Sequence, residues 1–179
     1  MRNFAPIMID VVSIVQVKAF ARQSGVFLAL LWLASFAAMM YAPQSPWGSL
    51  LAIATPFLVG WLLKRFRDGA LEGRISFRRS FAFSVLTFFY ASMIFALGQY
   101  VYFRFLDHGA FLTNLLNDIK VIKEAYAQNG MSVKELEDGA TLVGALSPIQ
   151  LAFMFMMQNI FVGFVLSVPV ALVCKKKQK

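Results

Sequence analysis

Four long apolar runs, none of which contains Asp, Glu, Lys, Arg or His, restrict what this chain can fold into. A helix that crosses a hydrocarbon layer of ~30 Å needs about 20 residues. With their flanking residues, the runs predict membrane-spanning helices at 25–42, 48–66, 81–105 and 148–174. The composition agrees, because 59% of the 179 residues are hydrophobic and the mean hydropathy is +0.67. A soluble chain of this size could not bury so much apolar surface. We therefore predict an all-α polytopic membrane protein with a four-helix membrane domain at 25–174.

The charges between the runs predict an orientation. Segments 1–24, 64–80 and 175–179 hold 13 of the 17 Lys and Arg residues and have a net charge of +10, whereas the rest of the chain has −2. Because basic segments that flank spans stay in the cytoplasm, both termini are expected there, and 175–179 is a basic cytoplasmic tail. The basic loops are also expected to contact anionic lipid headgroups. No nucleic-acid partner is expected, because the basic residues flank apolar runs.

Two segments outside the spans are predicted to be helical. Segment 1–24 is apolar with spaced polar residues, and it is either a helix in the membrane interface or an extension that packs on the bundle. Segment 107–147 is predicted to be an extracytoplasmic helical hairpin between the third and fourth spans. Gly130 is its predicted C-cap, and Ser132 and Glu135 have capping-box spacing. The apolar residues of its first helix are Leu112, Leu115, Leu116, Ile119, Ile122 and Tyr126.

The stretch GQYVYFRFLDHGAF at 98–111 combines aromatic residues with Arg104, Asp107 and His108, the only histidine. Tyrosine rings are frequent where a helix leaves a membrane. Arg104 and Asp107 are three residues apart and are expected to pair on one helix face. Asp107 is also expected to cap a helix that starts near residue 110. Catalysis would need a second acid, a nucleophile or a metal ligand nearby, and the sequence supplies none.

The spans contain few polar residues that could form a site. Asn159, Gly163 and Ser167 follow one another at intervals of four, and Gln99 lies near the end of the third span. Small and polar residues at this spacing favour close helix packing, while a stripe that lines a substrate path is the alternative. One histidine and one cysteine leave no metal or cofactor site to predict. We expect the protein not to be an enzyme.

The motifs GRISFRRSFAFSVL, GQYVYFRFLDHGAF and SPIQLAFMFMMQNIFVGFVLSVPVALVCKKK carry a family resemblance. They resemble small bacterial inner-membrane proteins known as domain-of-unknown-function family 4199, over most of residues 25–177. His108 departs from the pattern, which has proline after the aspartate. The resemblance implies a four-helix domain in the bacterial inner membrane, no known activity, and an association with lipid-linked sugar or envelope biosynthesis. The matching residues are Gly73, Ile75, Ser76, Phe77, Tyr100, Tyr102, Phe103, Asp107, Pro148 and Gly163.

Two functions from different classes remain open. The first is a non-enzymatic accessory or scaffold subunit that holds a membrane partner through the outer hairpin and a methionine-rich face of the fourth span. The second is a small transporter or lipid-carrier translocase, acting as a homo-oligomer, with a path lined by Gln99, Asn159 and Ser167. The absence of charged residues inside the runs favours the first function, because ion-coupled transport usually needs such a residue.

Overall fold

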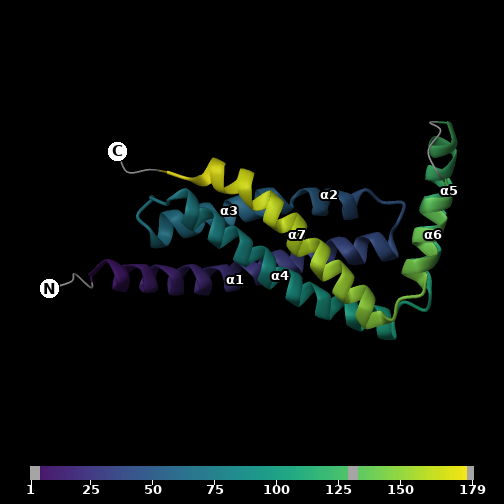
Figure 1. The fold of residues 1–179 in the computed structure, drawn as a ribbon, viewed down its shortest axis with the longest axis horizontal. Coiled ribbons are helices and arrows are strands. Elements are labelled where there is room, and N and C mark those ends of the chain that lie inside the picture. Colours follow the sequence, from purple (N-terminus) through teal and green to yellow (C-terminus); the bar gives the residue numbers. More distant parts are fainter. Residues whose placement is uncertain (1–4, 129–132, 177–179) are drawn as a thin grey trace. The chain divides into compact units, whose positions relative to one another are not determined.

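The computed structural model describes residues 5–128 and 133–176, and every regular element in these ranges is a helix (Figure 1). The all-α prediction is confirmed. The chain forms two compact units: unit 1 comprises Met1–Phe95 and Met156–Lys179, and unit 2 comprises Ala96–Phe155. The helices are α1 (Ala5–Tyr41), α2 (Trp47–Ile53), α3 (Thr55–Ala70), α4 (Phe77–Phe105), α5 (Ala110–Gln128), α6 (Val133–Gly144) and α7 (Pro148–Cys174).

α1 is one unbroken helix of 37 residues, so no boundary separates segment 1–24 from the first apolar run. Val17, Ala21 and Ser24 are buried in unit 1. Around Val17, Ala21 and Ser24, α1 therefore packs against the rest of unit 1. The chain can continue the helix because helix-compatible residues run through Gly25, and the next proline, Pro43, lies beyond the end of α1.

The length of α1 changes the charge content of the first candidate span. The part of α1 that is apolar enough to cross a membrane is Ile14–Tyr41. This range includes Lys18 and Arg22, both of which are exposed. The absence of charged residues, which holds for the predicted run at 25–42, therefore does not extend to the whole of this candidate span.

The second apolar run forms two helices with a bend of 41° between α2 and α3. Pro56 stands in the first turn of α3, and because it has no backbone N–H it cannot continue the hydrogen bonds of α2. α1 forms hydrogen bonds with both helices. The Ser35 hydroxyl donates to the Gly48 carbonyl of α2 at 2.7 Å, and the Trp32 indole N–H donates to the Thr55 hydroxyl of α3 at 2.9 Å. The described residues thus contain three helices able to cross a membrane, or four if the bent pair is one span.

α1 and α4 run in the same direction within unit 1. Near their N-terminal ends, Arg79 donates to the Gln16 side chain at 2.9 Å. Further along both helices, the rings of Phe36 and Phe95 lie 5.9 Å apart. The N-terminal halves of α1 and α4 therefore lie at the same end of the unit.

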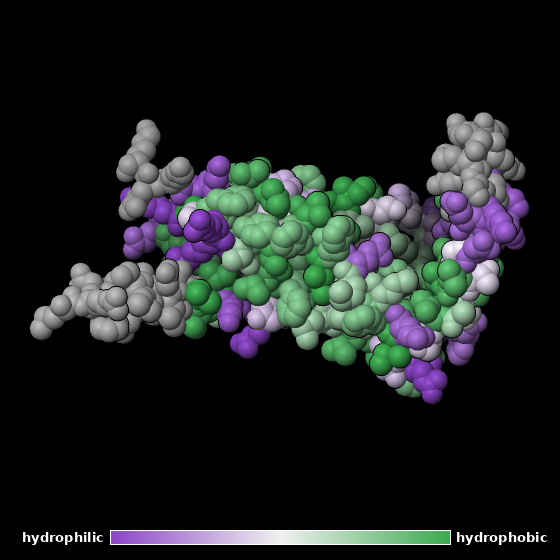
Figure 2. All heavy atoms as spheres, in the orientation of Figure 1, coloured by the Kyte–Doolittle hydropathy of each residue, from purple (hydrophilic) through white to green (hydrophobic). Residues whose placement is uncertain are grey.

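α3 and α7 run in the opposite direction. Phe66, near the end of α3, stacks on Phe83 near the start of α4 with ring centroids 4.9 Å apart. Cys174, the last residue of α7, donates its thiol to the Gly60 carbonyl of α3 at 3.6 Å. One end of unit 1, which we call the basic end, consequently gathers Lys18, Arg22, Lys64, Arg65, Arg67, Arg74, Arg78, Arg79, Lys175 and Lys176. Figure 2 shows hydrophilic side chains at this end and an apolar surface beside it.

Unit 2 joins the end of α4, the start of α7 and the predicted outer hairpin. The rings of Phe103, Phe111 and Phe155 come from α4, α5 and α7, and their centroids lie 5.2 to 6.1 Å apart. α5 and α6 pack on each other, with Leu112 against Gly144. Lys123 and Glu137 form an ion pair of 2.8 Å between these helices. The helical segments predicted at 107–147 are present, while Gly130 and Ser132 lie outside the described residues.

Candidate functional site

α4 presents a row of small polar side chains on its buried face in unit 1. Ser84, Thr87 and Ser92 are fully buried, and each hydroxyl donates to the carbonyl four residues earlier, at 3.0, 2.8 and 2.8 Å. Such bonds satisfy a hydroxyl inside its own helix. Small residues then let neighbouring helices approach closely. These three hydroxyls therefore support packing and are not free to line a path.

Gly163 and Ser167 from the predicted α7 stripe lie at a close contact with α4. A Cβ atom added to Gly163 would lie 2.5 Å from both Cβ and Cγ of Phe88, so no side chain fits there without movement. The Ser167 hydroxyl is buried and donates to the Gly163 carbonyl at 2.7 Å. Asn159, the third member of the stripe, is only partly buried. The geometry of Gly163 and Ser167 is that of helix packing.

Gln99 belongs to unit 2 and lies in α4, whereas the α7 stripe belongs to unit 1. Its side chain is only 2% exposed, and its Oε1 atom accepts no hydrogen bond from the described residues. An unpaired buried acceptor is costly, so packing alone does not explain Gln99. The Ser80 hydroxyl, also in α4, is likewise buried without a partner among the described residues.

The exit stretch forms a tight turn between α4 and α5. The N–H groups of Leu106 and Asp107 both donate to the Tyr102 carbonyl, at 2.8 and 3.0 Å, and this ends α4. His108 and Gly109 then have φ values of +39° and +85°, which reverse the chain. Glycine adopts this conformation readily.

Asp107 caps α5 and does not pair with Arg104. Its Oδ1 atom accepts the backbone N–H of Phe111 at 2.8 Å. Arg104 is exposed, and among the described residues it forms no ion pair with Asp107. The expected pair assumed that the helix continues through Asp107, but α4 ends at Phe105, so the two residues no longer share a helix face.

Replacing Asp107 with alanine should destabilise the start of α5 by about 1 kcal/mol, because a backbone N–H loses its acceptor. Hydrogen exchange at Phe111 should become faster, since the turn opens more often. Asp118→Ala removes an exposed carboxylate from the middle of α5 and is the matched control. Equal exchange rates at Phe111 in both variants would contradict the capping role.

The α5–α6 hairpin has an apolar surface that its own packing does not cover. Leu142 in α6 is 70% exposed, and Leu116 and Ile122 in α5 are exposed as well. We call these three residues the hairpin surface. The predicted methionine-rich face of α7 is divided, because Phe153 and Met157 are exposed whereas Phe155 is held in the aromatic cluster of unit 2.

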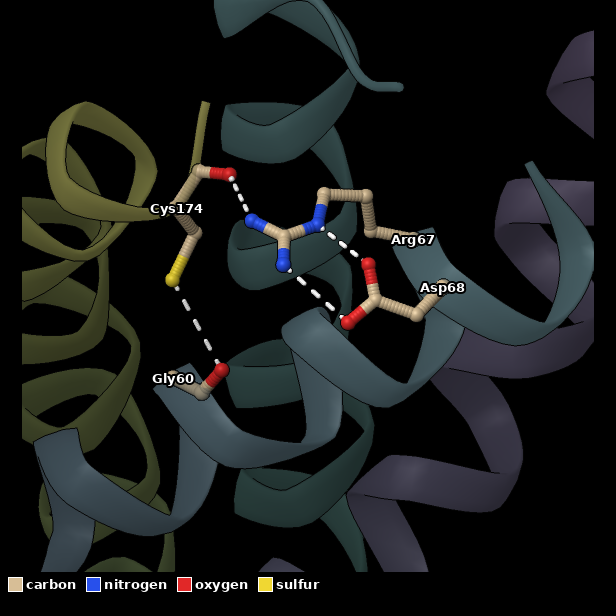
Figure 3. A network of polar contacts seen from close by, with 4 residues as sticks. All are labelled: Gly60, Arg67, Asp68 and Cys174. Atoms are coloured by element: carbon tan, nitrogen blue, oxygen red, sulfur yellow. Dashed lines mark hydrogen bonds and ion pairs between the residues drawn. The ribbon is translucent and has the colours of Figure 1, made fainter. Parts of the chain in front are cut away.

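Arg67 contacts both Asp68 and Cys174 at the basic end (Figure 3). Its guanidinium forms a two-point contact with Asp68, at 2.7 and 3.0 Å, and donates a third bond to the Cys174 carbonyl at 3.0 Å. The Cys174 thiol reaches the Gly60 carbonyl. Arg67 therefore connects the last turn of α3 to the end of α7.

A backbone pairing strengthens this connection. The N–H of Ile75 donates to the Lys176 carbonyl at 3.2 Å, and the N–H of Lys176 donates to the Ile75 carbonyl at 3.1 Å. The α3–α4 loop and the first residues after α7 are thereby fixed side by side. Sequence reasoning missed both Arg67 and this pairing, because nothing local to either segment identifies a partner about a hundred positions away.

Within residues 5–128 and 133–176, no group of three or more His, Cys, Asp or Glu side chains could hold a metal ion. Searches of the curated proteins and of the solved structures found no match. A family profile, described as "Protein of unknown function (DUF4199)", matches residues 23–176. This range contains all the described spans except the start of α1, and it includes the exit turn, the hairpin and the basic end. The chain belongs to the DUF4199 family.

Proposed function

We propose that the protein is a non-enzymatic accessory or scaffold subunit of the bacterial inner membrane that binds a membrane partner through the hairpin surface. In this proposal the bent α2–α3 pair is one span, the spans number four, and both termini are cytoplasmic. The strong positive charge of the segments at the basic end supports this orientation.

The observation that carries the proposal is the hairpin itself. An aromatic cluster fixes it to the ends of α4 and α7, and the Lys123–Glu137 ion pair joins its helices. Leu116 and Leu142 nevertheless remain exposed. A folded and anchored element that presents large apolar side chains is suited to binding another protein. The hydroxyls of Ser84, Thr87, Ser92 and Ser167 instead donate within their own helices.

Photo-crosslinking in native membranes tests this proposal. A crosslinking amino acid at position 142 should give one discrete adduct with a partner protein, whereas the same residue at the exposed position 113 should give none. The unmodified protein should co-purify with that partner at a stoichiometric ratio, and Leu142→Gln should abolish this co-purification. Lys120→Gln, at an exposed position of α5, is the matched control and should retain it. Adducts only with a second copy of the chain would contradict the accessory function.

The second candidate is a small oligomeric transporter or lipid-carrier translocase, linked to lipid-linked sugar or envelope biosynthesis. Two observations favour it: the unpaired Oε1 atom of Gln99 and the break between α2 and α3. Broken helices frequently mark binding sites in transporters. If the crosslinking experiment yields complexes that contain only copies of this chain, the transporter function is favoured over the accessory function.

A further inference from the structure

Lys18 and Arg22 stand four residues apart on α1, so they share one face of the helix. Both side chains are exposed, and neither has an ion-pair partner among the residues that the structure describes. A helix rises about 1.5 Å per residue, so the two Cα atoms are separated by about 6 Å along the axis. Both long side chains can therefore reach a single anionic group.

The packing of α1 places these two cations level with the end of the apolar part of α7. Phe20, which lies between them in sequence, packs on Phe66 with ring centroids 5.0 Å apart. The next residue of α3, Arg67, bonds to the Cys174 carbonyl at 3.0 Å, where the apolar residues of α7 give way to Lys175. Lipid phosphates lie at the edge of the hydrocarbon layer, and in a membrane the end of the apolar part of α7 would mark that edge.

Apolar residues continue the same exposed ridge of α1 away from the basic end. Val26 and Leu30 follow Arg22 at intervals of four and are 43% and 57% exposed. A phospholipid whose phosphate contacts Lys18 and Arg22 would therefore have its acyl chains along Val26 and Leu30. The ridge combines both features that a phospholipid requires, a cationic pair and an apolar track.

Charge complementarity favours a lipid phosphate over an acidic residue from a second copy of this chain. Of the acidic side chains described at the basic end, Asp68 is held by two bonds from Arg67, and Glu72 lies in the α3–α4 loop. We propose that Lys18 and Arg22 bind the phosphate of an anionic phospholipid in the membrane leaflet next to the basic end. This site differs from the loop at 64–80, where the sequence alone places lipid contacts. It does not depend on the accessory function.

Native mass spectrometry of the full-length protein in mild detergent tests the site. The probes are phosphatidylglycerol and phosphatidylcholine with identical acyl chains, added in steps. The double variant Lys18→Gln/Arg22→Gln should bind the first phosphatidylglycerol about tenfold more weakly than the unmodified protein, since each basic residue near an anionic surface adds to the attraction. Binding of phosphatidylcholine should change by less than about twofold, because its headgroup carries no net charge.

Arg104→Gln/Lys120→Gln is the matched control, since it removes two exposed cations that lie outside the basic loops. It should weaken phosphatidylglycerol binding by less than about threefold. An equal loss in both double variants would overturn the proposal, because binding would then follow net charge alone. Unchanged phosphatidylglycerol binding in Lys18→Gln/Arg22→Gln would also overturn it. Full displacement of the lipid by millimolar inorganic phosphate would show that the acyl track has no role and would contradict the lipid assignment. Thermal unfolding confirms that each variant is folded.

Discussion

Replacing Gly163 with alanine should destabilise unit 1 by about 1–3 kcal/mol, which is the usual cost of forcing extra atoms into a packed core. The added methyl group would meet Cβ and Cγ of Phe88 at 2.5 Å and Cδ1 at 2.7 Å. Phe88 is itself buried, with only 1% of its surface exposed, so its ring has little room to move away. α7 would have to shift away from α4. Thermal and denaturant unfolding in detergent, followed by circular dichroism, would measure the loss.

Gly60→Ala is the matched control, because a Cβ atom there meets only the Cys174 Sγ atom at 3.9 Å. That variant should be neutral or slightly more stable, since alanine favours a helix more than glycine does. In a Phe88→Ala background part of the cost of Gly163→Ala should disappear, because Cγ and Cδ1 of the ring are gone while the Cβ contact at 2.5 Å remains. A Gly163→Ala variant as stable as Gly60→Ala would show that α4 and α7 do not meet at this glycine.

Replacing Arg67 with methionine should detach the end of α7 from α3. The exchange removes the bond to the Cys174 carbonyl, and a hydrogen bond that involves a charged group contributes about 1.5–3 kcal/mol. The exposed contact with Asp68 should add little, because exposed ion pairs are weak. Lys175 and Lys176 are already exposed, but their backbone should open more often once this bond is lost. A shorter lag before trypsin cleaves at Lys175 or Lys176 would be the readout.

Arg65→Met provides a matched exchange within the same helix. Arg65 is exposed and lies over the Trp61 ring at 5.6 Å, with no bond to α7. Its loss should leave the cleavage lag unchanged, although both variants lose one positive charge. If both variants were cleaved at the same rate, the effect would come from charge, and the role assigned to Arg67 would be refuted.

The apolar runs predicted the helices well because a helix buried in lipid needs a minimum length and an apolar composition. Both properties are visible in a single sequence. α1 shows where this reasoning stops. Hydropathy predicts a span from residue 25, but the helix begins at Ala5, because nothing in the polarity of residues 14–24 breaks a helix. The break at Ala54 follows from a proline two residues later, and the sequence identifies that proline without giving the 41° bend.

The candidate site was predictable only in its local parts. Asp107 has the spacing of a cap, and the structure contains the corresponding bond to Phe111. Its expected pairing with Arg104 required knowledge of where α4 ends. Gly163 stands out as a small residue in an apolar run, but Phe88, which makes its size important, comes from another helix. The bond from Arg67 to Cys174 spans 107 positions, and no pattern in one sequence links such a pair.

Unit 1 is built from two separate stretches of the chain, with unit 2 between them. This arrangement determines the order in which the parts of unit 1 can assemble. Its first 95 residues are synthesised before the hairpin, and α7 enters the unit only after unit 2 has been made. Until then Phe88 has its contact with Trp32 of α1, but the side of Phe88 that meets Gly163 has no helix opposite it. The Ile75–Lys176 pairing requires residue 176, so it can form only after α7 has been synthesised. Any factor that shields this side of α4 during insertion would have to leave before α7 packs there. A chain truncated before residue 174 would lack both the Arg67–Cys174 bond and the Ile75–Lys176 pairing.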